Sequence, residues 1–276
     1  MTPKSPFQGF RLFSPYRLLA ISLCFSAGSC DRSTKDTNRL TLFAASSVAD
    51  VMTEIAARFE TERKVPVVIS QGSSGKLCRQ LQLGADCDLF VPADVAYLDL
   101  LHQSEKVLDS SRTALAWNEL VVVMAGFGHK VWTEAGRLRQ GPLESLVIAN
   151  PDHAPAGQYA VQALERAGLW QTLQPRTLYA DNVRLAARYV ADGGIQAGIL
   201  YATDALAFQD RVSVVYRFSP SDHREILYEG AVCAGAANRE RAQAFLRFAS
   251  STEVDEIWRN HGFVRRDRTL DTRKRR

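Results

Sequence analysis

The feature that most constrains the fold is an alternation of short apolar runs with longer stretches of helical periodicity. The apolar runs at residues 40–44, 65–70 and 88–91 are typical of buried strands. Apolar side chains recur at helical spacing over residues 48–59, and a further helical stretch covers residues 94–102. Strands that alternate with helices predict an α/β layer structure with a parallel sheet.

The same alternation begins again in the middle of the chain. Its strands and helices are expected at residues 120–124, 146–149, 157–167, 177–180, 184–191 and 197–201. A chain of 276 residues is long for one hydrophobic core. The two series therefore predict two α/β lobes, and the helical patterns at 239–249 and 254–261 are expected to return to the first lobe.

The start of the chain has the pattern of an export signal. Lys4, Arg11 and Arg17 precede a short apolar stretch at residues 18–25, with no acidic residue nearby. Small residues stand directly before Cys30, an arrangement that resembles the processing box of bacterial lipoproteins, in which the cysteine becomes the lipidated first residue. We therefore expect lipidation at Cys30 and an extracytoplasmic, membrane-tethered protein, with plain cleavage nearby as the alternative.

The net charge of +4 is unevenly distributed along the chain. Seven basic and two acidic residues lie at 265–276, and three basic residues with no acid precede residue 30. The region between them has more acidic than basic residues, which argues against a nucleic-acid-binding body. The expected organisation is a lipoprotein-type signal peptide at 1–29, a linker at 30–39, lobe 1 at 40–117 plus 231–264, lobe 2 at 118–230 and a basic C-terminal tail at 265–276.

The cysteines and histidines do not have metal-ligand spacing. Beyond Cys24 and Cys30 the chain has Cys78, Cys87 and Cys233, and its five histidines are scattered. Export permits a disulfide, and Cys78 with Cys87 is the closest pair, so the sequence leaves their pairing open.

Two serine-bearing turns follow the first two predicted strands. Ser47 comes after the first strand in the position of a helix N-cap, and Ser74 lies in the turn 70–75 that follows the second strand. Backbone N–H groups at a helix N-terminus have no partner within the helix, and the helix dipole is positive there. Two such turns on one sheet edge favour an anion-binding site.

The second series supplies matching loops. Residues 150–157 and 181–184 each lead into a predicted helix and can offer backbone N–H groups. Tyr201 ends the strand at 197–201, where its phenol could donate to a ligand oxygen or simply pack.

These segments together resemble the periplasmic molybdate-binding proteins of ABC transporters. The matching motifs are LTLFAASS at 40–47, QGSSG at 71–75, GADCDLFVPAD at 84–94, PDHAPAGQY at 151–159 and GILYATDA at 198–205. The resemblance covers residues 40–263 and implies a two-lobe, type II periplasmic-binding-protein fold that closes on a ligand in the interlobe cleft.

The resemblance also implies a ligand set and a function. The ligand contacts of that family fall on Ser47, Ser74, Ala156, Val183 and Tyr201, which would hold molybdate or tungstate through hydroxyl and backbone N–H donors, with no direct ligand to the metal atom. The implied protein is a non-enzymatic monomer without a cofactor that delivers its oxyanion to an ABC permease. Gly75 and Lys76 stand where the family often has small polar residues.

Other functions fit the sequence less well. A serine hydrolase needs a base beside its serine, and only His153 lies near the candidate loops, where a structural role is expected. A receptor for sulfate or phosphate remains the binding alternative. Receptors for amino acids would need a charged partner in the loops, and the five mapped positions have none.

Overall fold

The computed structural model describes residues 38–140 and 145–266. The predicted signal peptide, Cys30 and most of the basic tail lie outside the described residues. Within the described ranges, no helix is both long enough and apolar enough to cross a membrane.

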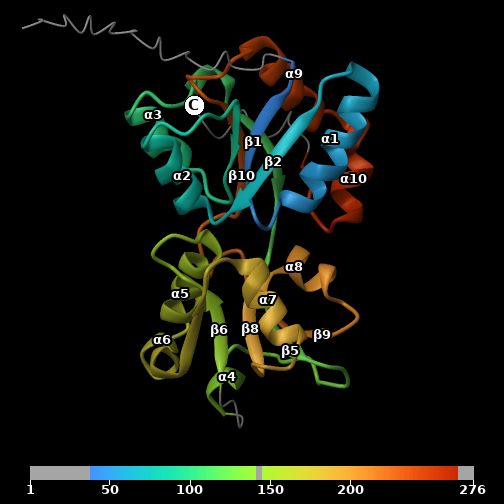
Figure 1. Cartoon of the computed structure of the whole chain (residues 1–276). Coiled ribbons are helices and arrows are strands. Elements are labelled where there is room, and N and C mark those ends of the chain that lie inside the picture. The colour runs from blue at the N-terminus through green and yellow to red at the C-terminus, as the bar shows by residue number, and fades with distance from the viewer. Residues whose placement is uncertain (1–37, 141–144, 267–276) are drawn as a thin grey trace, which may run out of the picture. The chain divides into compact units, whose positions relative to one another are not determined.

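The first sheet has the strand order β2-β1-β3-β10-β4 (Figure 1). Its strands are β1 (Leu40–Ala45), β2 (Val67–Gly72), β3 (Leu89–Val91), β4 (Thr113–Trp117) and β10 (Leu227–Val232). β1 runs parallel to β2 and β3, whereas β10 is antiparallel to both β3 and β4. The expected parallel sheet is thus a mixed one.

Helices cover both faces of this sheet. They are α1 (Ala49–Arg63), α2 (Ser74–Gln82), α3 (Ala96–Gln103), α9 (Arg239–Ala249) and α10 (Asp255–Asn260), with 3-10 turns η1 (Asp109–Ser111) and η3 (Thr252–Val254). Successive side chains of a strand point to opposite faces, so Leu42 and Phe43 enter different buried clusters. On the α1 side, the rings of Phe59 and Phe245 pack edge to face with centroids 5.1 Å apart.

The second sheet has the order β7-β6-β8-β5-β9. Its strands are β5 (Leu120–Ala125), β6 (Leu146–Ala149), β7 (Thr177–Ala180), β8 (Ala197–Tyr201) and β9 (Val212–Arg217). Its helices are α4 (Arg137–Gln140), α5 (Pro155–Arg166), α6 (Trp170–Leu173), α7 (Val183–Ala191) and α8 (Ala202–Ala207), with η2 at Gln174–Arg176. The two expected series of α/β elements therefore form two separate sheets.

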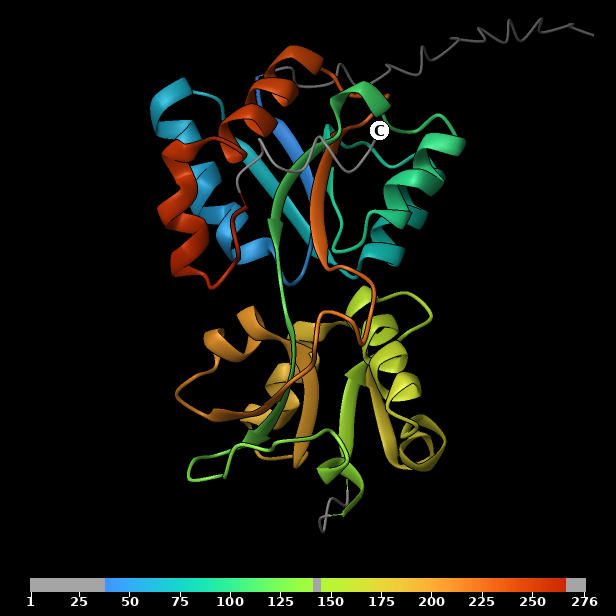
Figure 2. The ribbon, with the colours of Figure 1, turned by 180° about the vertical axis from the view of Figure 1, so that it is seen from behind.

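Two segments link the sheets. β4 runs into β5 through Asn118 and Glu119 alone, as the green strand in Figure 2 shows, and the chain returns between β9 and β10. β10 pairs with β3 and β4, so residues 227–230, which the sequence interpretation assigned to lobe 2, lie in the first sheet. The sequence of residues 227–232 alone could not show in which lobe this strand lies, because these residues would be buried in either sheet.

Cys78 and Cys87 are free, buried thiols in the structure, and no disulfide joins them. Burial raises the pKa of Cys78 to about 11, so this thiol is protonated and unreactive at neutral pH. The disulfide that the sequence left open is therefore not formed.

Candidate functional site

A small cavity lies where the loops of the two sheets meet. Its lining residues are Ala45, Ser46, Ser47, Gly72, Ser73, Ser74, Ala93, Ala154, Pro155, Ala156, Asn182, Val183 and Tyr201. The volume open to the centre of a water-sized sphere is about 10 Å³, far below that of cavities that hold drug-sized ligands. The cavity thus suits an ion or a very small molecule.

All five residues expected from the sequence line this one cavity. Ser47 lies between β1 and α1, Ser74 is the first residue of α2, and Tyr201 is the last residue of β8. Ala156 and Val183 lie in the first turns of α5 and α7. The carboxyl ends of strands and the N-termini of helices meet here, so backbone N–H groups without intrahelical partners surround the cavity.

The expected N-cap role of Ser47 is wrong. Val48 is the N-cap of α1 and makes no side-chain cap hydrogen bond. The hydroxyl of Ser47 instead lies 2.8 Å from the hydroxyl of Tyr228, which is 181 residues away in the sequence. The local sequence suggests a cap role for Ser47, but it does not indicate a hydrogen-bond partner that is so distant in the sequence.

The hydroxyl oxygen of Ser74 accepts one hydrogen bond from the protein. The backbone N–H of Ala93 donates to Ser74 Oγ at 3.0 Å. Because an N–H group can only donate, the hydrogen of the Ser74 hydroxyl is left for another acceptor. Ser74 is fully buried and lines the cavity, so that acceptor is best supplied by a ligand there.

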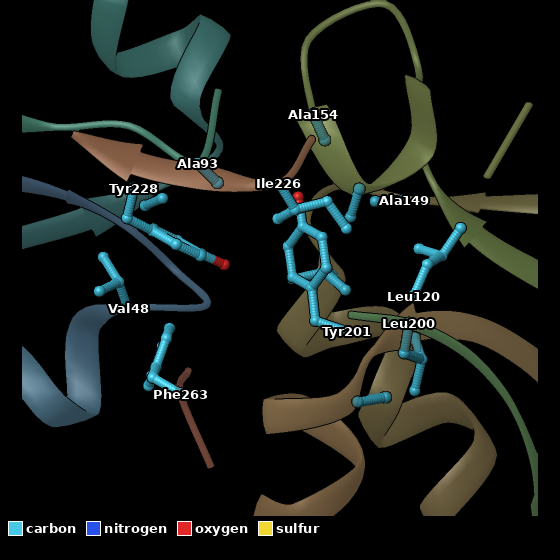
Figure 3. Packing of buried hydrophobic residues seen from close by; sticks show 14 of the residues in the cluster. Val48, Ala93, Leu120, Ala149, Ala154, Leu200, Tyr201, Ile226, Tyr228 and Phe263 are labelled. Carbon is cyan, nitrogen blue, oxygen red and sulfur yellow. The ribbon is translucent and has the colours of Figure 1, made fainter. Parts of the chain in front are cut away.

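Tyr201 has a buried hydroxyl with no hydrogen-bond partner among the described residues. Its side chain is only 1% exposed, and leaving a buried hydroxyl unsatisfied costs about 1–3 kcal/mol. Burial raises the pKa of Tyr201 well above its ordinary value, so the phenol keeps its hydrogen. Figure 3 shows the ring of Tyr201 among buried residues contributed by both lobes, which include Ala93 and Ala154. Such a donor requires an acceptor, which a ligand in the cavity would provide.

The electrostatics of the cavity come from neutral groups. In the part of the chain that the structure describes, every residue that lines the cavity is uncharged. The N-termini of α1, α2, α5 and α7 lie around it, and each carries the positive end of a helix dipole. Uncharged donors and the positive ends of helix dipoles can stabilise an anion without a positively charged side chain next to it.

The loops of the two sheets also contact each other directly. His153 Nδ1 lies 2.9 Å from Ser73 Oγ, and the N–H of Gly75 donates to the carbonyl oxygen of His153 at 2.9 Å. Lys76 forms an ion pair with Asp181, across the same boundary. His153 thus has the structural role expected of it, and Lys76 contacts the opposite lobe outside the cavity lining.

A second ion pair also connects the two lobes. Arg184 Nη2 lies 2.8 Å from Asp50 of α1, and Arg184 Nε lies 3.3 Å from Asp204 of α8. This Nε contact is an ion pair but does not meet hydrogen-bond geometry, since both oxygens of Asp204 lack hydrogen-bond partners. The Arg184–Asp50 pair and the His153 contacts both join the two lobes, which are therefore in a closed arrangement.

Several residues of the site were not expected from the sequence. Ser73, Ala93 and Asn182 line the cavity, and Tyr228 contacts Ser47 from behind it. The side chain of Asn182 caps α7 by accepting the N–H of Leu185 at 3.0 Å, and an asparagine before a helix is a signal that could have indicated it. Tyr228 gives no such signal, because it reads as an ordinary strand residue.

Comparison with known proteins agrees with this geometry. Residues 40–264 match the family model of the bacterial extracellular solute-binding proteins. The chain is 34% identical over 233 residues to the molybdate-binding protein ModA of Escherichia coli, covering 83% of the chain and 90% of that protein.

Solved structures show the same fold. The periplasmic molybdate-binding protein of Azotobacter vinelandii superposes with a TM-score of 0.74 at 23% identity, covering 83% of this chain and 100% of that one. The sulfate-binding protein SubI of Mycobacterium tuberculosis gives a TM-score of 0.70 at 17% identity, covering 86% and 90%. The two-lobe fold expected from the sequence is confirmed, and the chain belongs to the family of bacterial extracellular solute-binding proteins.

Proposed function

We propose that this protein binds molybdate or tungstate outside the cytoplasm and delivers it to an ABC import permease. The observation that carries the proposal is the uncharged cavity, into which the buried Tyr201 hydroxyl brings a donor without a partner. The similarity to the molybdate-binding protein of Escherichia coli over most of both chains supports the same ligand.

The donors are proposed to act as a ring around the oxyanion. Ser47 and Ser74 supply hydroxyl and backbone N–H groups from the first lobe. Ala156 and Val183 supply backbone N–H groups from the second lobe, and Tyr201 supplies its hydroxyl. Hydrogen bonds to an ionised acceptor are about twice as strong as neutral ones, so such a ring can replace the hydration shell of a dianion.

The directions of the hydroxyls favour a fully deprotonated oxyanion. Ser74 already accepts from Ala93, and its hydrogen, which has no acceptor among the described residues, is the group that it offers to the ligand. Phosphate carries at least one proton at neutral pH and needs an acceptor, which makes it a poorer ligand. Sulfate meets the same requirement as molybdate, and the fold alone does not separate them, because the sulfate-binding protein SubI shares it. The size of the closed ring is the property proposed to exclude sulfate.

A hydrolase is not favoured by the contacts of His153. A catalytic histidine beside a serine is held by an acid at hydrogen-bond distance. Here Ser73 Oγ lies 2.9 Å from His153 Nδ1, but His153 Nε2 is 4.0 Å from Asp181, whose carboxylate pairs with Lys76. We propose that this group of residues closes the lobes and that the protein acts without catalysis or a resident cofactor.

We further propose that the protein is a monomer tethered to the membrane by a lipid on Cys30. This part rests on the sequence alone, on the basic and apolar residues before Cys30 and on the small residues next to it. Metabolic labelling with a tagged fatty acid, compared between the wild type and Cys30→Ser, tests it. Label that persists in the variant would contradict it.

The test of the main proposal is calorimetric titration of the purified full chain with molybdate, tungstate, sulfate and phosphate. We expect one-to-one binding of molybdate or tungstate, much weaker binding of sulfate, and weaker molybdate binding in Ser47→Ala and Ser74→Ala. If no oxyanion binds, the receptor proposal is wrong. If sulfate binds as tightly as molybdate, the fold and pocket stand but the proposed ligand is wrong.

A further inference from the structure

We propose that Asn118 and Tyr228 are positioning residues that fix the direction of the Ser47 hydroxyl, so that its hydrogen points at the bound oxyanion. This inference rests on the proposed function. It concerns three side chains that are nearly or fully buried and that form one chain of hydrogen bonds leading to the cavity.

The first step is the orientation of the Asn118 amide. The backbone N–H of Glu119 donates to Asn118 Oδ1 at 2.9 Å. A backbone N–H can only donate, so the atom facing it must be the oxygen, and Nδ2 must face the other way. The two hydrogens of Nδ2 then go to Thr203 Oγ1 at 2.9 Å and to the Tyr228 hydroxyl at 3.3 Å. The amide is therefore fully used and cannot reverse without losing three bonds.

The second step is the direction of the Tyr228 hydroxyl. Its oxygen accepts from Asn118, so its own hydrogen goes to the other hydrogen-bond partner of this group among the described residues, Ser47 Oγ at 2.8 Å. Burial raises the pKa of Tyr228 above its ordinary value, so the phenol keeps that hydrogen. Figure 3 shows the ring of Tyr228 in the buried cluster with its hydroxyl directed toward the side of Tyr201.

The third step concerns Ser47 itself. Because Ser47 accepts from Tyr228, its own hydrogen is free to point into the cavity that Ser47 lines. Ser74 has the same arrangement, with the N–H of Ala93 as the donor to its oxygen. Both serines are thus set to donate, and neither has to turn when a dianion arrives.

The chain of bonds also connects the ligand site with the link between the lobes. Asn118 lies in the two-residue connection from β4 to β5, and Tyr228 lies in β10, which follows the returning segment. Thr203 belongs to α8 of the second lobe. The Ser47 hydroxyl is therefore held by residues that come together only where the chain passes between the two sheets.

The first experiment compares Tyr228→Phe, Ser47→Ala and the double variant by calorimetric titration of the full chain with molybdate. Losing one neutral hydrogen bond should weaken binding about 3–10-fold in Tyr228→Phe. In the Ser47→Ala background the same change should have less than about a twofold effect, because Tyr228 acts through Ser47. Tyr216→Phe, on β9 and away from the cavity, is the matched control.

The second experiment reverses the first bond of the chain. In Asn118→Asp, at pH 8, the carboxylate accepts the hydrogen of Tyr228, so Tyr228 can no longer donate to Ser47. Ser47 must then either give its hydrogen to Tyr228 or leave two oxygens in contact with no hydrogen between them. Binding should fall more than tenfold. Adding Tyr228→Phe should now restore binding by about threefold or more, although that change alone weakens it.

This reversal of sign separates positioning from a merely structural role. A loss of packing at Tyr228 would weaken binding in every background, and the repulsion between a new carboxylate and the ligand is present with or without the phenol. If the wild type binds molybdate but Tyr228→Phe does not change the affinity, the inference is wrong and the receptor function stands. The same conclusion follows if Tyr228→Phe weakens binding in the Ser47→Ala and Asn118→Asp backgrounds as much as it does in the wild type. If the wild type binds no oxyanion, both fail. Thermal unfolding of each variant verifies that it is folded.

Discussion

Gly75 lies where the two lobes touch, and replacing it with alanine should block their closure. A Cβ atom at this position would lie 2.7 Å from the carbonyl oxygen of His153 and 2.9 Å from its Cα. Both are backbone atoms of the opposite lobe and cannot turn away as a side chain could. Gly75 is helical and has no left-handed backbone angle, so alanine itself is compatible with α2.

The expected cost follows from these distances. Ordinary contacts begin at 3.4 Å, so the lobes must separate by about 0.7 Å at this point. The hydrogen bond from Gly75 N to His153 O, now 2.9 Å, would then exceed hydrogen-bond length. Overpacking of this kind costs about 1–3 kcal/mol, and a value of about 2 kcal/mol corresponds to roughly thirtyfold weaker binding. The open form does not have this contact and does not incur the cost.

Calorimetric titration with molybdate and thermal unfolding without ligand together test this reasoning. Gly75→Ala should bind roughly thirtyfold more weakly, while its melting temperature without ligand stays unchanged or rises slightly, because alanine favours a helix over glycine. Gly194→Ala is the matched control, since a Cβ there comes no closer than 3.6 Å to any atom. Wild-type affinity in Gly75→Ala would show that ligand binding does not need the contact between α2 and His153.

Three further predictions address single groups of the site and its surroundings. Tyr201→Phe should weaken molybdate binding at least about tenfold, because a hydrogen bond to an ionised acceptor contributes about 1.5–3 kcal/mol, and an unchanged Kd would refute its role as a donor. Burial raises the pKa of Asp204 from 3.8 to about 6, so the folded state binds this proton more tightly than the unfolded state. The contribution of Asp204 to the free energy of unfolding therefore falls by about 3 kcal/mol as the pH rises from about 4 to about 6. Urea unfolding of Asp204→Asn should lack this decrease, and parallel pH profiles would contradict it. Lys76→Gln should change the Kd for molybdate less than about fivefold, and only at low salt, because the Lys76–Asp181 pair is half exposed. A larger change, or one that does not depend on salt, in the same titrations would contradict this prediction.

The parts of this fold that local patterns specify could be predicted from the sequence. The strands at Leu146–Ala149, Thr177–Ala180 and Ala197–Tyr201 begin and end where the apolar runs do. The side chains of β6 and β8 are all buried, so their burial is visible in the apolar sequence itself, whereas Leu178 and Tyr179 of the edge strand β7 are exposed although the strand looks equally apolar. The same holds for the loops at helix N-termini, because a strand followed by a helix places its connecting turn at one edge of the sheet.

The rest depends on partners that are distant in the sequence. Local patterns did not indicate β4 (Thr113–Trp117), a five-residue strand with a partly buried start, or its antiparallel pairing with β10. They also could not separate a capping serine from one held by a tyrosine. Ser47 has the residue type and position of an N-cap, but its hydroxyl is engaged by Tyr228 from another part of the chain. The pairing of β10 with distant strands brings Tyr228 to Ser47, and the residues next to Ser47 in the sequence do not indicate that pairing.

The charged pairs that bridge the lobes lie outside the cavity that we propose as the ligand site. Lys76 with Asp181 and Arg184 with Asp50 bridge the two lobes, and none of the four lines the cavity. A lysine or arginine inside it would bind the dianion strongly in the open form as well, since charge attraction acts at long range. Neutral donors act only at hydrogen-bond distance, so the ring is complete only when both lobes contribute. Opening the lobes removes half of the donors and lets water replace them. A receptor that must both capture and release its oxyanion gains from this separation between the charges that assist closure and the dipoles that recognise the ligand.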